Sequence, residues 1–95
     1  MAKKIAVGID IGTYQIKVVV AEYVREKDKE FPYIIGTGYS ESKGLRHGYI
    51  VNTADVIKSI RMAVRQAEKA SNTPIKRAYI SVGGVGLESA NAPGR

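Results

Sequence analysis

The chain has 95 residues, of which 44% are hydrophobic and 25% are charged, and its 15 Lys and Arg against 9 Asp and Glu give a net charge of +6. A chain of this length folds as one domain at most, which excludes a two-lobed enzyme with a closing cleft for these residues alone. Cysteine is absent, so disulfides, thiolate zinc sites and thiol nucleophiles are also excluded.

Two strands are predicted at the start of the chain, joined by a tight turn. Residues 4–10 and 15–24 are rich in branched side chains, and residues 18–20 are continuously apolar, which is typical of a strand covered on both faces. The short connection predicts an antiparallel hairpin. All six residues from 25 to 30 are charged and predict a solvated turn, after which residues 31–39 predict a third strand.

A loop and a long helix are predicted next. Residues 40–48 contain two glycines and predict a loop, with a short return strand at residues 49–51. Asn52 or Thr53 is suited to cap the helix, because a side-chain oxygen there accepts a hydrogen bond from a free backbone N–H group. Apolar residues at three- and four-residue spacing predict a buried stripe along about five helical turns, made of Val56, Ile57, Ile60, Ala63, Val64 and Ala67.

A fourth strand completes the predicted elements. The helix is expected to end before Pro74, and residues 75–82 predict a strand that is broken by the glycines from residue 83 onward. Residues 89–95 are predicted to have no regular structure. The resulting order, β-β-β-α-β, belongs to the α/β class, with a mixed sheet and one long helix.

The residues around the first turn carry chemistry suited to a nucleotide phosphate tail. Asp10 ends the first strand, Gly12 and Thr13 follow in the turn, and Lys17 lies on the returning strand. Gly12 lets backbone N–H groups approach phosphate oxygens closely, and the hydroxyl of Thr13 can donate to the same oxygens. Lys17 supplies a positive charge, and Asp10 can hold a hydrated magnesium ion. The same residues are ordinary turn residues, so the spacing alone leaves both interpretations open.

Two common nucleotide motifs are excluded at this turn. The chain has no Gly-Lys-Ser/Thr sequence and therefore no Walker loop, and the glycine turn leads into a strand, whereas a dinucleotide fingerprint leads into a helix. With its apolar flanks at residues 5–9 and 16–20, the stretch Asp10-Ile11-Gly12-Thr13 resembles the first phosphate motif of the actin-like ATPase superfamily.

Downstream residues narrow this resemblance to the FtsA family of actin-like cell-division proteins. Residues 35–38 read Ile-Gly-Thr-Gly, and the stretch 42–51, which begins at Ser42, precedes the helix as it does in that family. Residues 78–84 are similar to the strand that opens the inserted subdomain of FtsA. The resemblance covers nearly all of residues 4–90, although Tyr14 and Gln15 stand where the family usually carries a small residue and often a lysine.

The resemblance implies a fold and a set of site residues. Residues 1–74 would form the N-terminal part of an actin-like (ribonuclease-H-like) lobe, and residues 75–95 the start of the inserted subdomain. The strand at residues 75–82 has a second possible place, parallel to the first strand at the edge of its sheet. ATP and magnesium are the implied cofactors. The resemblance assigns no catalytic residue; it gives a water-mediated magnesium contact to Asp10 and phosphate contacts to Gly12, Thr13, Tyr14 and Lys17.

The family also implies partners and a location. FtsZ and other divisome proteins would be partners of the full-length protein, which would lie in the cytoplasm at the inner face of the membrane at the division site. Because family members are several times longer, this chain is expected to hold half of a phosphate clamp, to bind Mg-ATP weakly or not at all and to hydrolyse none. A pilus-assembly or microcompartment relative and a fragment of a sugar-kinase-like phosphotransferase are the alternatives.

The surfaces of the predicted fold suggest further contacts. The basic residues are spread along the chain without a zinc-finger or RNA-recognition pattern, so we expect no nucleic-acid partner. No apolar run approaches the ~20 residues of a membrane span, so membrane contact would be peripheral. One side of the helix forms either a solvated face or a contact for anionic headgroups or an acidic partner, through Lys58, Arg61, Arg65 and Lys69. A sheet carrying a single helix leaves one apolar face bare, which predicts self-association.

Overall fold

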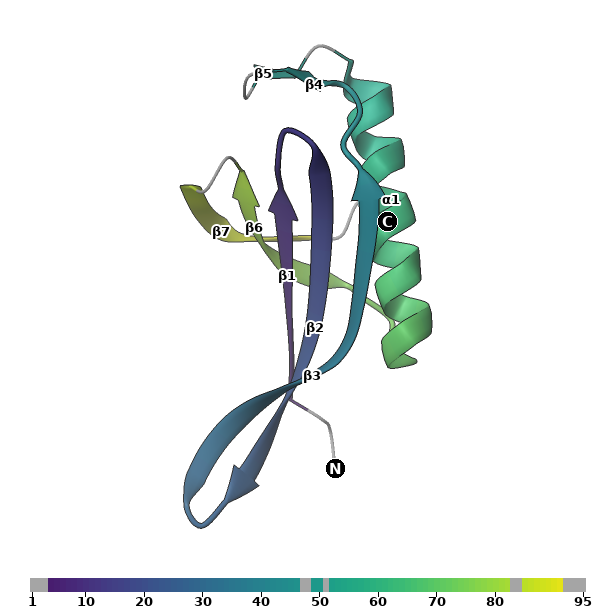
Figure 1. The fold of residues 1–95 in the computed structure, drawn as a ribbon. Coiled ribbons are helices and arrows are strands. Elements are labelled where there is room, and N and C mark those ends of the chain that lie inside the picture. Colours follow the sequence, from purple (N-terminus) through teal and green to yellow (C-terminus); the bar gives the residue numbers. More distant parts are fainter. Residues whose placement is uncertain (1–3, 47–48, 51, 83–84, 92–95) are drawn as a thin grey trace.

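The structure is a computed structural model, and it describes residues 4–46, 49–50, 52–82 and 85–91. The elements are β1 (Ile5–Ile11), β2 (Gln15–Glu26), β3 (Lys29–Glu41), β4 (Leu45–Arg46), β5 (Tyr49–Ile50), α1 (Thr53–Ser71), β6 (Arg77–Val82) and β7 (Val85–Asn91). Five strands form one sheet in the order β3-β2-β1-β6-β7, and β4 and β5 form a separate hairpin (Figure 1). The predicted α/β class, with a mixed sheet and one long helix, is confirmed, but β4 and β7 are additional to the predicted order β-β-β-α-β. The loop predicted over residues 40–48 contains the end of β3 and the whole of β4.

The sheet is mixed because one of its pairings is parallel. β2 pairs antiparallel with both β1 and β3, whereas β6 lies parallel to β1, with Gly8 opposite Tyr79 and Asp10 opposite Ser81. The fourth predicted strand, β6, therefore lies parallel beside the first strand. The division between the N-terminal part of the lobe (residues 1–74) and the start of the inserted subdomain (residues 75–95) stays a prediction.

The C-terminal part of the sheet differs from the sequence prediction. Residues 89–91 were predicted to be irregular, but they belong to β7, which pairs antiparallel with β6. The prediction was wrong because the β7 sequence, VGLESAN, has little of the alternation that indicates a strand. Pairing with β7 supplies hydrogen-bond partners for the edge of β6 that β1 does not use.

The hairpin of β2 and β3 is longer than predicted. Only Lys27 and Asp28 form its turn, with φ values of 49° and 67°, as in the two-residue turns that match strand twist. The prediction of a turn over residues 25–30 was therefore wrong. Charged side chains continue the strands because Arg25 lies opposite Glu30, and such cross-strand pairs of opposite charge favour the sheet. Residues 22–33 form an arm that projects beyond the start of β1 (Figure 1).

The core lies between α1 and one face of the sheet. Alternate residues of β1 and β2 point into it, and Ile16, Val18 and Val20 are fully buried. The predicted helix stripe is confirmed except at Ile57, which is 38% exposed, while Ser59 takes a buried place. The hydroxyl of Ser59 accepts a hydrogen bond from the backbone N–H of Lys43, which satisfies its polar group in the core.

Two glycines allow α1 to approach β3 and the loop that follows it. A Cβ atom at Gly38 would collide with the backbone of Ala63 and Ala67, so the helix is close to the strand at this point. Gly44 has a φ of 82°, which favours glycine, and it also lies against the start of α1. The N-terminus of the helix is capped by Asn52, whose side-chain oxygen accepts from the backbone N–H of Asp55, as the sequence predicts.

The other face of the sheet is not covered by a helix in the part of the chain that the structure describes (Figure 1). We call it the open face. It carries the alternate residues of β1, β2 and β6, including Gly8, Asp10, Lys17, Val19, Tyr79 and Ser81. The prediction that residues 18–20 are covered on both faces was therefore wrong for this chain, since Val19 is only partly buried. No helix among the described residues is long and apolar enough to cross a membrane.

Candidate functional site

The turn between β1 and β2 is short and accessible. The backbone N–H of Gly12 donates to the carbonyl oxygen of Gln15 at 3.0 Å, which leaves Thr13 and Tyr14 at the tip. The Tyr14 side chain is 87% exposed and does not close over the turn. In the described part of the chain, the backbone N–H groups of Thr13 and Tyr14 enter no hydrogen bond. They are therefore available to an anionic ligand.

Gly12 has a structural role within the turn. Its N–H group is used inside the turn, and its φ lies outside the left-handed region that favours glycine. A Cβ atom at this position would lie 3.0 Å from the carbonyl oxygen of Gln15, which is a tight contact. Gly12 thus permits the close turn, while the free N–H groups belong to the two residues that follow it.

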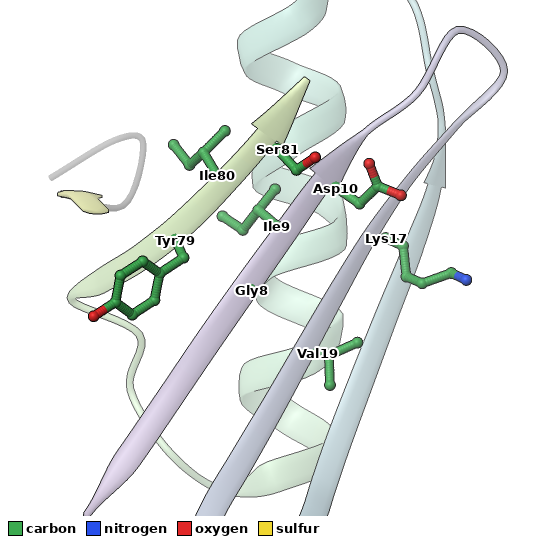
Figure 2. A pocket seen from close by; sticks show the side chains of 8 residues that line it. All are labelled: Gly8, Ile9, Asp10, Lys17, Val19, Tyr79, Ile80 and Ser81. Atoms are coloured by element: carbon green, nitrogen blue, oxygen red, sulfur yellow. The ribbon is translucent and has the colours of Figure 1, made fainter. Parts of the chain in front are cut away.

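Asp10 and Lys17 face each other across β1 and β2. They are directly paired in the antiparallel register, so both side chains lie on the open face, and both are exposed. No ion pair joins them: the Nζ atom of Lys17 lies 5.9 Å from the centre of the Tyr39 ring. Figure 2 shows the lysine extending away from the carboxylate. The acid and the amine therefore share one face of the sheet, and each remains available to a ligand.

A cavity of about 320 Å³ lies on the open face beside this pair. Its lining is mostly apolar and includes Ile9, Val19, Tyr79 and Ile80, together with Gly8, Asp10, Lys17 and Ser81 (Figure 2). A Cβ atom at Gly8 would meet nothing within 4 Å, so this glycine leaves open space on the strand surface.

The cavity adds residues that sequence reasoning missed. Ser81 is the parallel neighbour of Asp10, and Tyr79 that of Gly8. The alternating pattern of residues 77–82 indicates that Tyr79 and Ser81 share a face. Only the pairing of β6 with β1 brings that face to the site, so no local sequence signal gives their position.

The segment after β3 ties the turn to α1. The backbone N–H of Ser42 donates to the carbonyl oxygen of Tyr14 at 3.0 Å, and that of Lys43 donates to the Ser59 hydroxyl at 3.2 Å. The Ser40 hydroxyl donates to the carbonyl oxygen of Ser59. The Ser42 hydroxyl oxygen is buried and has no hydrogen-bond partner among the described residues. The start of the stretch 42–51 thus positions the turn relative to the helix, and its residues 47, 48 and 51 lie outside the described part of the chain.

Comparison with known proteins tests the resemblance to FtsA. No protein-family model matches the chain. It is 40% identical over 88 residues to the cell division protein FtsA of Enterococcus hirae, covering 93% of this chain and 19% of that protein. It is 31% identical over 91 residues to FtsA of Pseudomonas aeruginosa, covering 96% and 21%, and 38% identical over 78 residues to FtsA of Bacillus subtilis, covering 82% and 17%. The chain spans about a fifth of the length of these curated relatives. The resemblance is confirmed: over most of its length, the chain is similar to a part of FtsA cell division proteins.

Proposed function

We propose that this chain contributes the first phosphate-binding hairpin of an ATP site, and an assembly surface, to an FtsA-like cell-division protein. The observation that supports the ATP site best is the pairing of Asp10 with Lys17 on the open face, next to a turn with two free backbone N–H groups. An anion, a cation and backbone donors within one hairpin match the needs of a magnesium-bound phosphate tail.

Each residue of the hairpin has a proposed role. The N–H groups of Thr13 and Tyr14 and the hydroxyl of Thr13 donate to phosphate oxygens, and Gly12 keeps the turn tight enough to present them. Lys17 balances the negative charge of the phosphates, and Asp10 holds magnesium through the water molecules of the ion. These residues fit Mg-ATP because their donors are exposed and because no ion pair with another described residue neutralises Asp10 or Lys17.

The isolated chain is proposed to bind nucleotide weakly. It spans about a fifth of its relatives, and its described residues present donors from one side of the phosphates only. Tight binding and hydrolysis require groups that converge from several directions, so a single wall supplies little affinity and no catalysis.

A chimaeric protein tests this function. The 88 residues matched in Enterococcus hirae FtsA would be replaced by the corresponding part of this chain, and Mg-ATP binding would be measured by calorimetry. Lys17→Ala is expected to weaken binding by about tenfold, the usual effect of losing a charge-assisted contact. Lys29→Ala, at the tip of the arm, is the matched control and should leave the affinity unchanged. Equal affinities for both variants would contradict the proposed role of the hairpin.

Partners and location follow from the same proposal. FtsZ and other divisome proteins would be the partners of the longer protein, at the inner face of the membrane at the division site. The open face is the proposed assembly surface, because it presents apolar side chains without a covering helix among the described residues. The relatives named above are cell-division proteins, which favours this function over a pilus-assembly, microcompartment or sugar-kinase role.

A further inference from the structure

The outer surface of α1 carries a continuous row of positive charge. Lys58, Arg61, Arg65 and Lys69, which we call the basic arc, recur at intervals of three and four residues and are all exposed. At 100° per residue they occupy a narrow sector of the helix, opposite the stripe that is buried against the sheet. From Lys58 to Lys69, the arc extends roughly 16 Å along the helix axis.

No acidic group neutralises the basic arc in the described part of the chain. None of its four side chains forms an ion pair with another described residue. The Glu68 carboxylate accepts a hydrogen bond from the backbone N–H of Ile75 at 2.8 Å, which directs it toward the end of the helix. Asp55 lies in the first helical turn, where it complements the helix dipole. The outer surface of α1 therefore keeps an excess of positive charge.

Exposed apolar side chains accompany these charges. Met62 is 57% exposed and Ile57 is 38% exposed, and both lie beside the basic arc. Together with Ala54, Lys58, Arg61 and Arg65 they line a shallow hollow of about 480 Å³ on the outside of the helix. Cations beside apolar side chains suit an interface where negative headgroups lie above hydrocarbon.

We propose that α1 lays its basic arc against a membrane surface rich in anionic lipid. The helix lies on the outside of the sheet, so its outer surface can approach a flat partner along its whole length (Figure 1). A bilayer with anionic headgroups matches both the row of charge and the exposed Met62 and Ile57. An acidic peptide would need a groove to fix it, and the hollow on α1 is shallow and lies on a single helix. This inference does not depend on nucleotide binding.

Vesicle co-sedimentation of the 95-residue chain tests the proposal. The chain is expected to bind phosphatidylglycerol-containing vesicles and not pure phosphatidylcholine vesicles. The double variant Arg61→Glu/Arg65→Glu is expected to lower partitioning to the anionic vesicles by more than about tenfold. The matched control is Lys27→Glu/Lys29→Glu, which makes the same change in net charge at the tip of the arm and should lower partitioning by less than about threefold. Met62→Ser should make the remaining binding more sensitive to salt.

Four outcomes would overturn the proposal. The first is an equal loss of partitioning for the two double variants, which would indicate an effect of net charge. The second and third are equal binding to both kinds of vesicle and failure of the unaltered chain to bind anionic vesicles. The fourth is tighter binding to a polyglutamate peptide than to the vesicles. Circular dichroism of each variant checks that α1 is retained, and the altered side chains are exposed, so the core is not disturbed.

Discussion

The two faces of the sheet are built from the same strands but differ in what they contact. On β1, Val7, Ile9 and Ile11 are buried beneath α1, whereas the intervening Gly8 and Asp10 are exposed on the open face. Strand alternation produces this separation, because neighbouring side chains point to opposite faces. The covered face holds the fold together, and the open face presents the acid, the amine and the cavity.

Glycine shows the difference between the faces most clearly. Gly38 faces α1, where a Cβ atom would collide with the helix backbone, whereas Gly8 faces open space. At position 38, the absence of a side chain is required for the helix to pack against the strand. At position 8, it leaves room for the cavity.

The largest expected effect comes from Gly38→Ala. The added methyl group must displace α1 from β3, and overpacking of this kind should lower the free energy of unfolding by about 3 kcal/mol or more. Gly8→Ala is the matched control and should change it by less than about 0.5 kcal/mol. Urea denaturation measures both variants. Similar losses of unfolding free energy in the two variants would contradict the difference in packing between the covered face and the open face.

An intermediate effect is expected for self-association through the open face. Sedimentation velocity at increasing concentration should show dimers, because Tyr79 is 64% exposed beside the partly buried Val19 and the apolar cavity. Val19→Glu places a charge in this surface and should weaken association by about tenfold or more. Met62→Glu, on the outside of α1, is the control and should have little effect. A chain that stays monomeric at every concentration would contradict the prediction.

Local sequence patterns predicted the first half of the fold well. Alternation identified β1, a continuous run of branched apolar residues identified β2, and three- and four-residue spacing identified α1, because these signals come from neighbouring residues on one element. Asp10 was predicted at the end of the first strand and Lys17 on the returning strand, and the register of the hairpin places them opposite each other.

Features that depend on distant contacts were missed. β7 lacks a clear pattern of its own and forms by pairing with β6, and Ser81 reaches the site only because β6 lies beside β1. The apolar side chain of Val19 led to the prediction that its strand is covered on both faces. An apolar residue does not by itself show whether a second layer of structure covers it. The length of the arm depends on a two-residue turn at Lys27 and Asp28, which the run of charges conceals.

The smallest expected effect concerns the arm, which α1 does not cover. The Tyr33 hydroxyl donates to the Glu26 carboxylate at 3.0 Å. This hydrogen bond, and then the negative charge of Glu26, raise the pKa of Tyr33 above its ordinary value of 10.0. Folding therefore favours the neutral phenol. The small stabilisation is complete below the pKa of the unfolded chain and is lost as the pH rises through the pKa of the folded chain.

Glu26→Gln tests this contact, because it removes the charge and weakens the hydrogen bond. Titration of the Tyr33 ring carbons by NMR should show its pKa falling toward the ordinary value in this variant. Glu22→Gln is the matched control: Glu22 is the cross-strand partner of Tyr33 but makes no hydrogen bond to it, so the titration should not move. Equal shifts in the two variants would mean that the general charge of the arm sets the pKa. The ion pair between Glu30 and Lys4 at 3.0 Å would then remain as a specific polar contact of the arm, beside the pairing of its strands.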